Sequence, residues 1–247
     1  MDVGLRIRNQ DTGQIQIGAG YQNLQLAKSG TLDTGTFSGG ATGGSPPFAS
    51  WSPRGLLAST AGTTNLHVVR YINDSVAYIT GFSIVQSGVT CSVFAASNAP
   101  NKTLEYYTFD ATERAASGPV GLRMRGEDGS VFYDSRRKGV RVLQVVPLPP
   151  PPVNTPFVEV GQFFPGRKIG IAIPSPRFYY SSVSQDRCTA YADAFHMTSD
   201  NRIYMSKHET FSQTLITNTF PVGGVTMGPQ NATIFIVDLT EVPLGFG

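Results

Sequence analysis

Alternation of apolar and polar residues, the pattern of a half-buried β-strand, recurs along most of the chain. Residues 3–8 and 14–17 alternate in this way and flank a Gly-containing turn at 11–13, which predicts a β-hairpin. Further runs rich in β-branched and aromatic residues, separated by short Asn, Asp, Ser and Gly clusters, predict more strands. These runs cover residues 66–72, 76–85, 89–97, 104–110, 168–173, 177–184, 188–197, 202–211 and 232–239.

Two segments interrupt the strand pattern. Residues 27–65 are dominated by Gly, Ser, Thr and Pro, and predict a long irregular segment with short strands at most. Residues 147–156 form a proline-rich run, which is typical of a semi-rigid spacer. We therefore expect an all-β chain with two β-sandwich-like regions and long Gly/Ser/Pro-rich loops. The expected boundaries are an N-terminal domain at 1–146, a linker at 147–156 and a C-terminal domain at 157–247.

Composition agrees with this fold class and excludes several functions. The 27 glycines and 17 prolines among 247 residues argue against helical bundles, because both residues destabilise helix interiors. A net charge of +2 argues against a dedicated nucleic-acid-binding protein. No apolar stretch is long enough for a membrane span, and the first residues lack the pattern of a signal peptide. We expect neither nucleic-acid binding nor membrane insertion.

A short unit occurs twice. Residues 3–13 (VGLRIRNQDTG) match residues 120–129 (VGLRMRGEDG) with a one-residue gap, and an alternating strand follows each copy. The pattern predicts two hairpins in which the apolar residues point to one face and the arginine pair to the other.

The second copy and its flanks carry a family resemblance. Residues 121–138 combine a Gly-Leu strand start, an Asp-Gly turn, the run Val-Phe-Tyr-Asp-Ser and a basic stretch. This order resembles small tail-tip and tail-fibre proteins of tailed bacteriophages. Residues 104–119 and the closing run 234–243 resemble segments of the same proteins, whereas the first copy matches more loosely and lacks the Asp-Ser pair. Residues 157–235 resemble nothing that we can match.

The resemblance implies a structural virion component of the tail (tip, fibre or baseplate) that assembles and attaches to a host cell. Its partners would be other tail proteins, further copies of itself with a trimer as the first expectation, and a host surface glycan or protein. The region 1–146 would attach to the tail. The chain would be made in the bacterial cytoplasm and would end up in the virion. It implies no enzymatic activity and no cofactor.

Binding residues are only weakly indicated. Trp51 is the single tryptophan and lies in the Gly/Pro-rich segment. Adjacent aromatic pairs, 163–164 and 179–180, cannot both face inward from a strand, so one member of each, such as Tyr179 or Tyr180, could stack on a sugar or anchor an interface. A basic cluster at 123–141 includes Arg136 and Arg137; interspersed acids also fit an ordinary solvated strand face.

Chemistry gives two alternatives to a structural role. Acids such as Asp186, Asp193 and Glu209 could act as a glycosidase pair on host polysaccharide, because such pairs meet only in space, although ordinary surface acids fit equally. A lectin-like module or capsid decoration protein is the other alternative. Cys91 and Cys188 are expected on strands as buried thiols, and the spacing of Cys188 from the histidines fits no zinc site.

Overall fold

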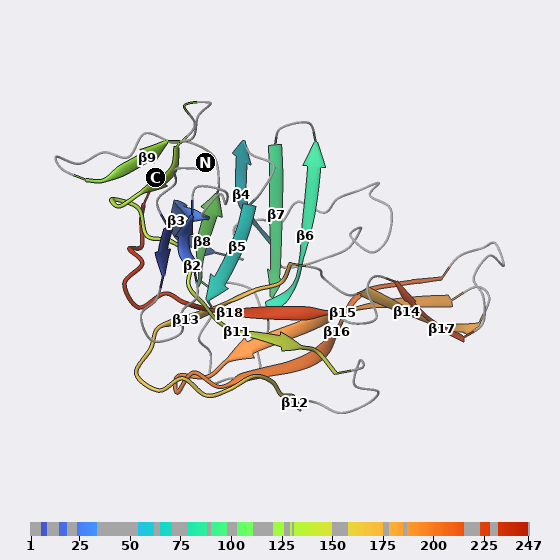
Figure 1. Cartoon of the computed structure of the whole chain (residues 1–247). Helices are drawn as coiled ribbons and strands as arrows, with labels where there is room; N and C mark the ends of the chain where they lie inside the picture. The colour runs from blue at the N-terminus through green and yellow to red at the C-terminus, as the bar shows by residue number, and fades with distance from the viewer. Residues whose placement is uncertain are drawn as a thin grey trace.

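The computed structural model describes about two thirds of the chain. The described residues are 6–8, 15–18, 24–33, 54–61, 65–70, 79–87, 90–97, 103–110, 121–125, 129, 131–149, 158–174, 178–184, 187–214, 223–227 and 232–246. All regular elements in these ranges are β-strands, arranged in antiparallel sheets (Figure 1). The all-β prediction is confirmed. Within the same ranges, no helix has the length and apolarity that would let it cross a membrane.

The first large sheet, sheet I, contains six antiparallel strands drawn from the whole length of the chain. In spatial order they are β11 (Val142–Pro147), β18 (Thr233–Asp238), β13 (Ile169–Ala172), β5 (Asn65–Arg70), β8 (Thr103–Asp110) and β3 (Gln25–Asp33).

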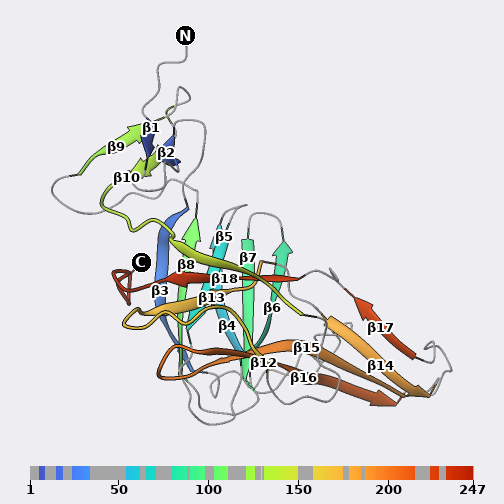
Figure 2. The ribbon, with the colours of Figure 1, turned by 60° about the horizontal axis from the view of Figure 1, so that its bottom comes forward.

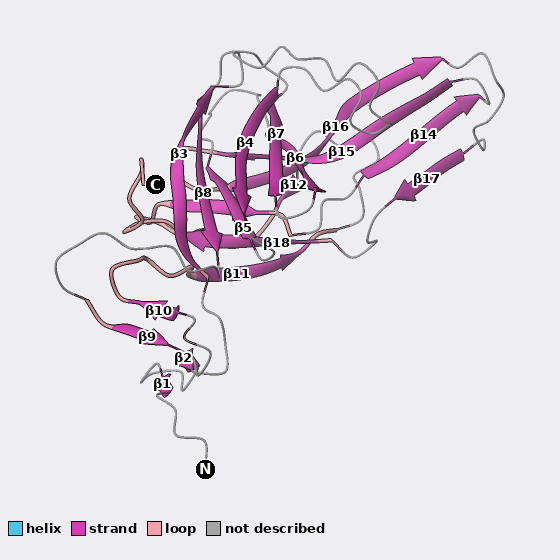
Figure 3. Cartoon of the chain, turned by 90° about the horizontal axis from the view of Figure 1, so that it is seen from above, coloured by secondary structure: helices cyan, strands magenta, loops and turns pink. Residues whose placement is uncertain are grey.

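The second large sheet, sheet II, contains eight strands. Six follow one path: β12 (Val158–Glu159), β16 (Ile203–Thr214), β15 (Arg187–Met197), β6 (Ile79–Ser87), β7 (Thr90–Ser97) and β4 (Arg54–Ala61). The other two are β14 (Phe178–Ser184), which pairs with β15, and β17 (Gly223–Met227), which pairs with β14. The long strands β14 to β17 run out to one end of the molecule, as Figures 2 and 3 show.

Two small hairpins lie outside both large sheets. They are formed by β1 (Arg6–Arg8) with β2 (Ile15–Gly18) and by β9 (Arg123–Arg125) with β10 (Val131–Asp134). These are the two copies of the sequence repeat, so both predicted hairpins are confirmed. They lie at the end of the molecule opposite to β14 and β17 (Figures 2 and 3).

The main core lies between sheets I and II. Alternate residues of sheet I, such as Ile171 and Ile236, point toward sheet II, where Phe195 and Met205 are almost completely buried. Such burial contributes about 1.5–3 kcal/mol for each large apolar side chain. This packing holds β15 and β16 against β13 and β18, and so positions the turns that leave their ends.

A second apolar cluster covers the opposite face of sheet I. Tyr107 and Phe109 are buried there beneath the segment that follows β18, which includes Leu239 and Val242. The segment returns to β3, where the backbone N–H of Ser29 donates to the carbonyl of Phe246 at 2.8 Å. Sheet I is therefore buried on both faces, which explains why its central strands β13 and β18 are continuously apolar rather than alternating.

The proline-rich run does not separate the sheets. In sheet I, β13 pairs with β5 through Ile171 opposite Val69, and β11 pairs with β18 through Val146 opposite Ile234. Sheet II likewise joins β6 to β15. The expected division into sandwich-like regions at 1–146 and 157–247 therefore does not correspond to the hydrogen bonding, because local sequence patterns carry no information about which strands pair. Residues 150–157 lie outside the described part.

The segment 27–65 also differs from its expectation. Instead of short strands at most, it contains most of β3 (nine residues) and all of β4 (eight residues). Their sequences, QLAKSGTLD and RGLLASTA, lack strong alternation of apolar residues. Pairing with β8 and β7 supplies the strand geometry that local propensity does not.

The side chains of Val68 and Leu239 pack closely against the backbone of Gly170 in β13. A Cβ at this position would lie 2.6 Å from Val68 Cγ1 and 2.7 Å from Leu239 Cδ1. We expect Gly170→Ala to destabilise the fold by about 1–3 kcal/mol, because the buried neighbours must move. Urea unfolding measures this, with Gly139→Ala as the control, since its Cβ would meet only the Leu24 carbonyl at 4.0 Å. Equal stability of the two variants would contradict the packing described for β13.

Candidate functional site

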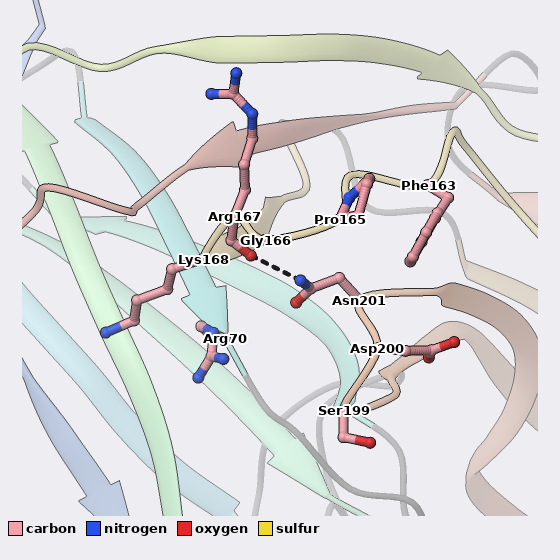
Figure 4. Close-up of a pocket in the computed structure, with 9 residues that line it drawn as sticks. All are labelled: Arg70, Phe163, Pro165, Gly166, Arg167, Lys168, Ser199, Asp200 and Asn201. Carbon is pink, nitrogen blue, oxygen red and sulfur yellow. Dashed lines mark hydrogen bonds between the residues drawn. The ribbon is translucent and has the colours of Figure 1, made fainter.

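Two tight turns from different parts of the chain border a cavity of about 510 Å³ beside the end of β5 (Figure 4). The first turn, 164–167, precedes β13 and contains Pro165 followed by Gly166 at φ +70°. Proline before a glycine of positive φ is the sequence of a type II turn. The second turn, 198–201, joins β15 to β16 and has the sequence Thr-Ser-Asp-Asn, whose residues favour turns.

Asn201 connects the two turns. Its backbone lies in the left-handed region at φ 65°, which Asn tolerates better than most residues, and its N–H donates to the Thr198 carbonyl at 2.9 Å. The side-chain Nδ2 donates to the Arg167 carbonyl at 2.7 Å. Because the nitrogen is engaged in this way, the amide oxygen is the atom that this side chain can offer to the cavity (Figure 4).

The inner wall of the cavity is basic. Lys168 Nζ lies 2.9 Å and Arg70 Nη1 lies 3.5 Å from the carboxylate of Glu105 on β8. Burial alone raises the pKa of Glu105, but hydrogen bonds from Lys168 and Tyr107 and the two positive charges lower it below its usual value. Two cations thus share one ionised carboxylate. Figure 4 shows the Lys168 side chain extending away from Phe163, Ser199 and Asp200 on the other side of the cavity.

Arg70 is the least satisfied of these groups. Its side chain is 18% exposed, its contact with Glu105 is long, and its Nε is buried without a hydrogen-bond partner among the described residues. Buried donors in native proteins normally have a partner, whether protein, water or ligand. The unpartnered Nε is itself buried, so it does not face the open cavity.

The outer rim combines an aromatic ring with polar groups. Phe163 is 44% exposed, and the guanidinium of Arg202 lies 5.3 Å from its ring centroid. Arg202 is itself held by Glu159 at 2.9 Å and Asp200 at 3.1 Å. Hydrogen bonds from Thr198 and Arg202 lower the pKa of Asp200, so its carboxylate is ionised at neutral pH. Ser199 completes this side of the cavity.

A second cavity of about 400 Å³ adjoins the first and shares Gly166 and Arg167 with it. In this second cavity, Arg141 Nη1 at 3.5 Å and Arg167 Nη1 at 2.5 Å both pair with Asp238. Burial raises the pKa of Asp238, but hydrogen bonds from Thr240 and Arg167 lower it overall. Figure 4 shows the Arg167 side chain pointing away from the first cavity, so its charge belongs to the second.

A further polar cluster joins the β9–β10 hairpin to sheet I. Asp134, 2% exposed, accepts hydrogen bonds from Arg136 Nε at 2.9 Å and Arg123 Nε at 3.2 Å. The Gln25 side chain on β3 donates to the Asp134 carbonyl at 2.8 Å and accepts from its N–H at 3.1 Å. The hydrogen bond from Arg136 is the main cause that lowers the pKa of Asp134 far below its usual range. This cluster fixes the hairpin on the body.

The binding residues expected from the sequence do not gather at one place. Arg136 is engaged with Asp134, and Arg137 is only 8% exposed. Tyr179 and Tyr180 lie in β14, but their side chains are outside the described part of the structure. Trp51 is outside it altogether. Of the pair 163–164, Phe163 is exposed and Phe164 packs against the main core; the pair lies between β12 and β13 rather than in a strand, so the expectation from strand alternation does not apply to it.

Of the candidate acids, Asp193 is buried in β15, and Glu209 lies in the paired strand β16, opposite Tyr191 and so two register positions from Asp193. Asp186 is outside the described residues. Where the structure describes side chains, no group of three His, Cys, Asp or Glu residues could hold a metal ion. Both cysteines lie on strands as predicted, Cys91 in β7 and Cys188 in β15.

Comparison of the chain with models of known protein families, with curated proteins and with solved structures finds no match. The cavity therefore has to be interpreted from its own residues. Its described lining is mostly polar, with charges of both signs and one aromatic ring.

Proposed function

We propose that the chain is a structural component of a bacteriophage tail, at the tip or in a fibre, that functions through assembly and attachment. The sequence resemblance at 121–138 suggests this context. The observation that carries the proposal is a part of sheet II that we call the arm: β14, β17, and the residues 187–192 and 208–214 of β15 and β16 that pair alongside β14 (Figure 3).

The arm extends away from sheet I (Figure 3). Among the residues of β15 and β16 whose side chains are described, Phe195, Met197, Ile203 and Met205 belong to the core cluster, and they lie at the end of the strand pair away from β14. Six further residues of β15 at about 3.3 Å each give the arm a length of roughly 20 Å. Its strand β17 pairs only with β14 among the described strands.

Among the described strands β17 forms the outer edge, and such an edge favours association with another chain, because its N–H and C=O groups can pair again. The two hairpins lie at the opposite end of the molecule, which gives it two ends for separate contacts (Figure 2). Such a shape suits a subunit that links neighbours in a tail. We propose other tail proteins and further copies of this chain as its partners, and the assembled virion as its location.

Absolute mass in solution tests the proposal. We expect size-exclusion chromatography with light scattering to give a stable trimer, which for chains of 26.5 kDa is about 80 kDa. Dilution of the protein before the measurement should leave this mass unchanged. A monomer at every concentration would contradict self-association, and absence of the protein from purified virions, probed with an antibody against it, would contradict the structural role.

A further inference from the structure

We propose that the open edge of sheet I, the side of β11 that pairs with no other described strand, binds an extended, acidic segment of a partner protein. The segment would add to the sheet as a further strand, with an acidic side chain at the end that lies beside Arg141. The inference goes beyond the proposed function, because it concerns a different edge from that of the arm and uses neither the arm nor the sequence resemblance.

The two edges of sheet I differ in what pairs with them. The outer side of β3 is occupied by other parts of the chain: the Leu26 N–H donates to the Lys138 carbonyl and the Ser29 N–H to the Phe246 carbonyl, each at 2.8 Å. Strand β11 pairs with β18 on one side, and no described strand pairs with its other side. Figure 3 shows β11 at the margin of the body. Sheet I therefore has one open edge in the described part of the chain.

The hydrogen bonds to β18 show which main-chain groups of β11 face this edge. The Leu148 N–H donates to the carbonyl of Ala232, which lies opposite it in the register of the pair. In an antiparallel pair, residues that bond the partner strand alternate with residues whose N–H and C=O point away from it. Val146 therefore bonds β18, and both main-chain groups of Val145 point to the open edge. Pro147 has no N–H, so the available stretch ends there.

The face of β11 beside the open edge is apolar and exposed. Val142 is 41% and Val145 is 55% exposed, and they lie opposite Val237 and Phe235 of β18, which pack in the second apolar cluster. The segment that covers this cluster leaves both valines in contact with solvent. In strand addition the main-chain hydrogen bonds provide affinity, and alternate side chains provide specificity. Apolar side chains on the added strand would cover the two valines.

Charge at the start of β11 selects an acidic partner. Lys138, Arg141 and Arg167 line the second cavity, where only two carboxylates, Asp238 and Glu241, lie among the described residues. Asp238 is almost completely buried and is bound by Arg167, whereas the contact of Arg141 with it is 3.5 Å long and the Arg141 side chain is 67% exposed. A carboxylate on the added strand would pair with Arg141 and balance the third cation.

The same charges argue against a second copy of this chain as the occupant. Residues 138–149 contain two basic residues and no acid. In antiparallel pairing of two β11 strands, Arg141 of one copy would lie beside the proline-rich end of the other and would meet no carboxylate. Parallel pairing would place two like charges side by side, which is destabilising. Because the described pairs in sheet I are antiparallel, we expect an antiparallel added strand whose C-terminal end lies beside Arg141.

Binding of synthetic peptides to the purified full chain, followed by fluorescence anisotropy, tests the inference. The acidic probe is a fluorescein-labelled peptide of sequence STVTVSEE with an amidated C-terminus. The neutral probe has glutamine in place of both glutamates, and a third probe has the acidic sequence with its central Thr-Val pair N-methylated. We expect the acidic probe to bind with a Kd below about 1 mM and about tenfold more tightly than the other two. Added salt should reduce its advantage over the neutral probe.

Two variants separate the main-chain and charge contributions. Val145→Pro removes the outward N–H without removing a bond to β18, and should weaken binding of the acidic probe by about tenfold or more. Its control, Val145→Thr, keeps the N–H and the branched shape and should bind within about threefold of the wild type. Arg141→Gln should abolish the preference for the acidic over the neutral probe. Its control, Arg125→Gln, changes an exposed arginine of β9 and should leave that preference unchanged. Thermal unfolding confirms that each variant is folded.

The inference is wrong if no probe binds at about 1 mM, if the acidic and neutral probes bind equally well, or if N-methylation has no effect. A lower solution mass of Val145→Pro would also overturn it, because a second copy would then occupy the edge. Should Val145→Pro not fold, the N-methylated probe and Arg141→Gln still decide the question. A trimer that binds no probe contradicts only this inference, and a monomer that binds the acidic probe contradicts only the proposed self-association.

Discussion

A chain that ends at residue 156 is expected to show no cooperative unfolding transition. It would lack β13 and β18, which are the second and third strands of sheet I and separate β11 from β5. It would also lose Phe195, Met205 and Ile236 from the main core. Each large apolar side chain lost from the core removes about 1.5–3 kcal/mol of burial, and a native domain is stable by only about 5–15 kcal/mol in total. Circular dichroism during heating measures the transition.

The control for this truncation removes residues 1–18. Strands β1 and β2 pair only with each other among the described strands, so the remaining chain should keep its transition. If the chain of residues 1–156 unfolded cooperatively, as two independent domains would require, the hydrogen bonding described for sheet I would not be what stabilises the N-terminal half.

Loss of the Asp134 carboxylate should have the second-largest effect on the stability of the fold. Asp134→Asn leaves Arg123 and Arg136 without their shared anion and weakens the attachment of the β9–β10 hairpin. We expect a destabilisation of about 2 kcal/mol at pH 7, within the range for hydrogen bonds to a charged group. The value stays moderate because the side chains of Arg123 and Arg136 are 33% and 20% exposed and remain partly hydrated.

The pH dependence of this difference has a defined sign. Hydrogen bonds from Arg136 lower the pKa of Asp134 in the folded state below the value of about 3.9 for an unfolded chain. The stabilisation is therefore complete above about pH 4 and decreases as the pH falls below it. Urea unfolding of the wild type and Asp134→Asn should show a difference that shrinks on acidification. Glu241→Gln, which changes an exposed pair, is the control; a pH-independent difference would contradict the role of ionised Asp134.

The sequence predicted the elements better than their arrangement. The strands around Val68, Tyr107 and Ile236 were predictable because β-branched and aromatic residues recur there and the turns between them contain Gly, Asn or Asp. Which strands pair was not predictable, since β13 meets β5 across about a hundred residues and no local pattern records that contact. The proline-rich run therefore resembled a domain boundary, although strands from before and after it pair within sheet I.

The candidate site shows the same limit. The turn sequence at 198–201 was recognisable. The turn at 164–167 was not predicted, and the exposure of Phe163 did not follow from strand alternation, because residues 163–164 lie between β12 and β13. Arg70 carried no signal, because an arginine at the end of an apolar strand is an ordinary solvated residue until the fold brings Glu105 and Lys168 beside it. Of the basic residues that did stand out, Arg136 is bound to Asp134 at the hairpin, and Arg137 is buried.

The strand order of sheet I has a consequence for biosynthesis. Strand β5 leaves the ribosome roughly a hundred residues before its neighbour β13, and β18 follows later still. At translation rates of about 5–20 residues per second, one edge of the nascent β5–β8–β3 sheet waits roughly 5–20 s for its partner. An apolar edge exposed for that time invites pairing between neighbouring nascent chains. Expression at a lower temperature or together with chaperones should therefore raise the yield of soluble protein. We expect substitutions on the surface of the folded protein to raise it less.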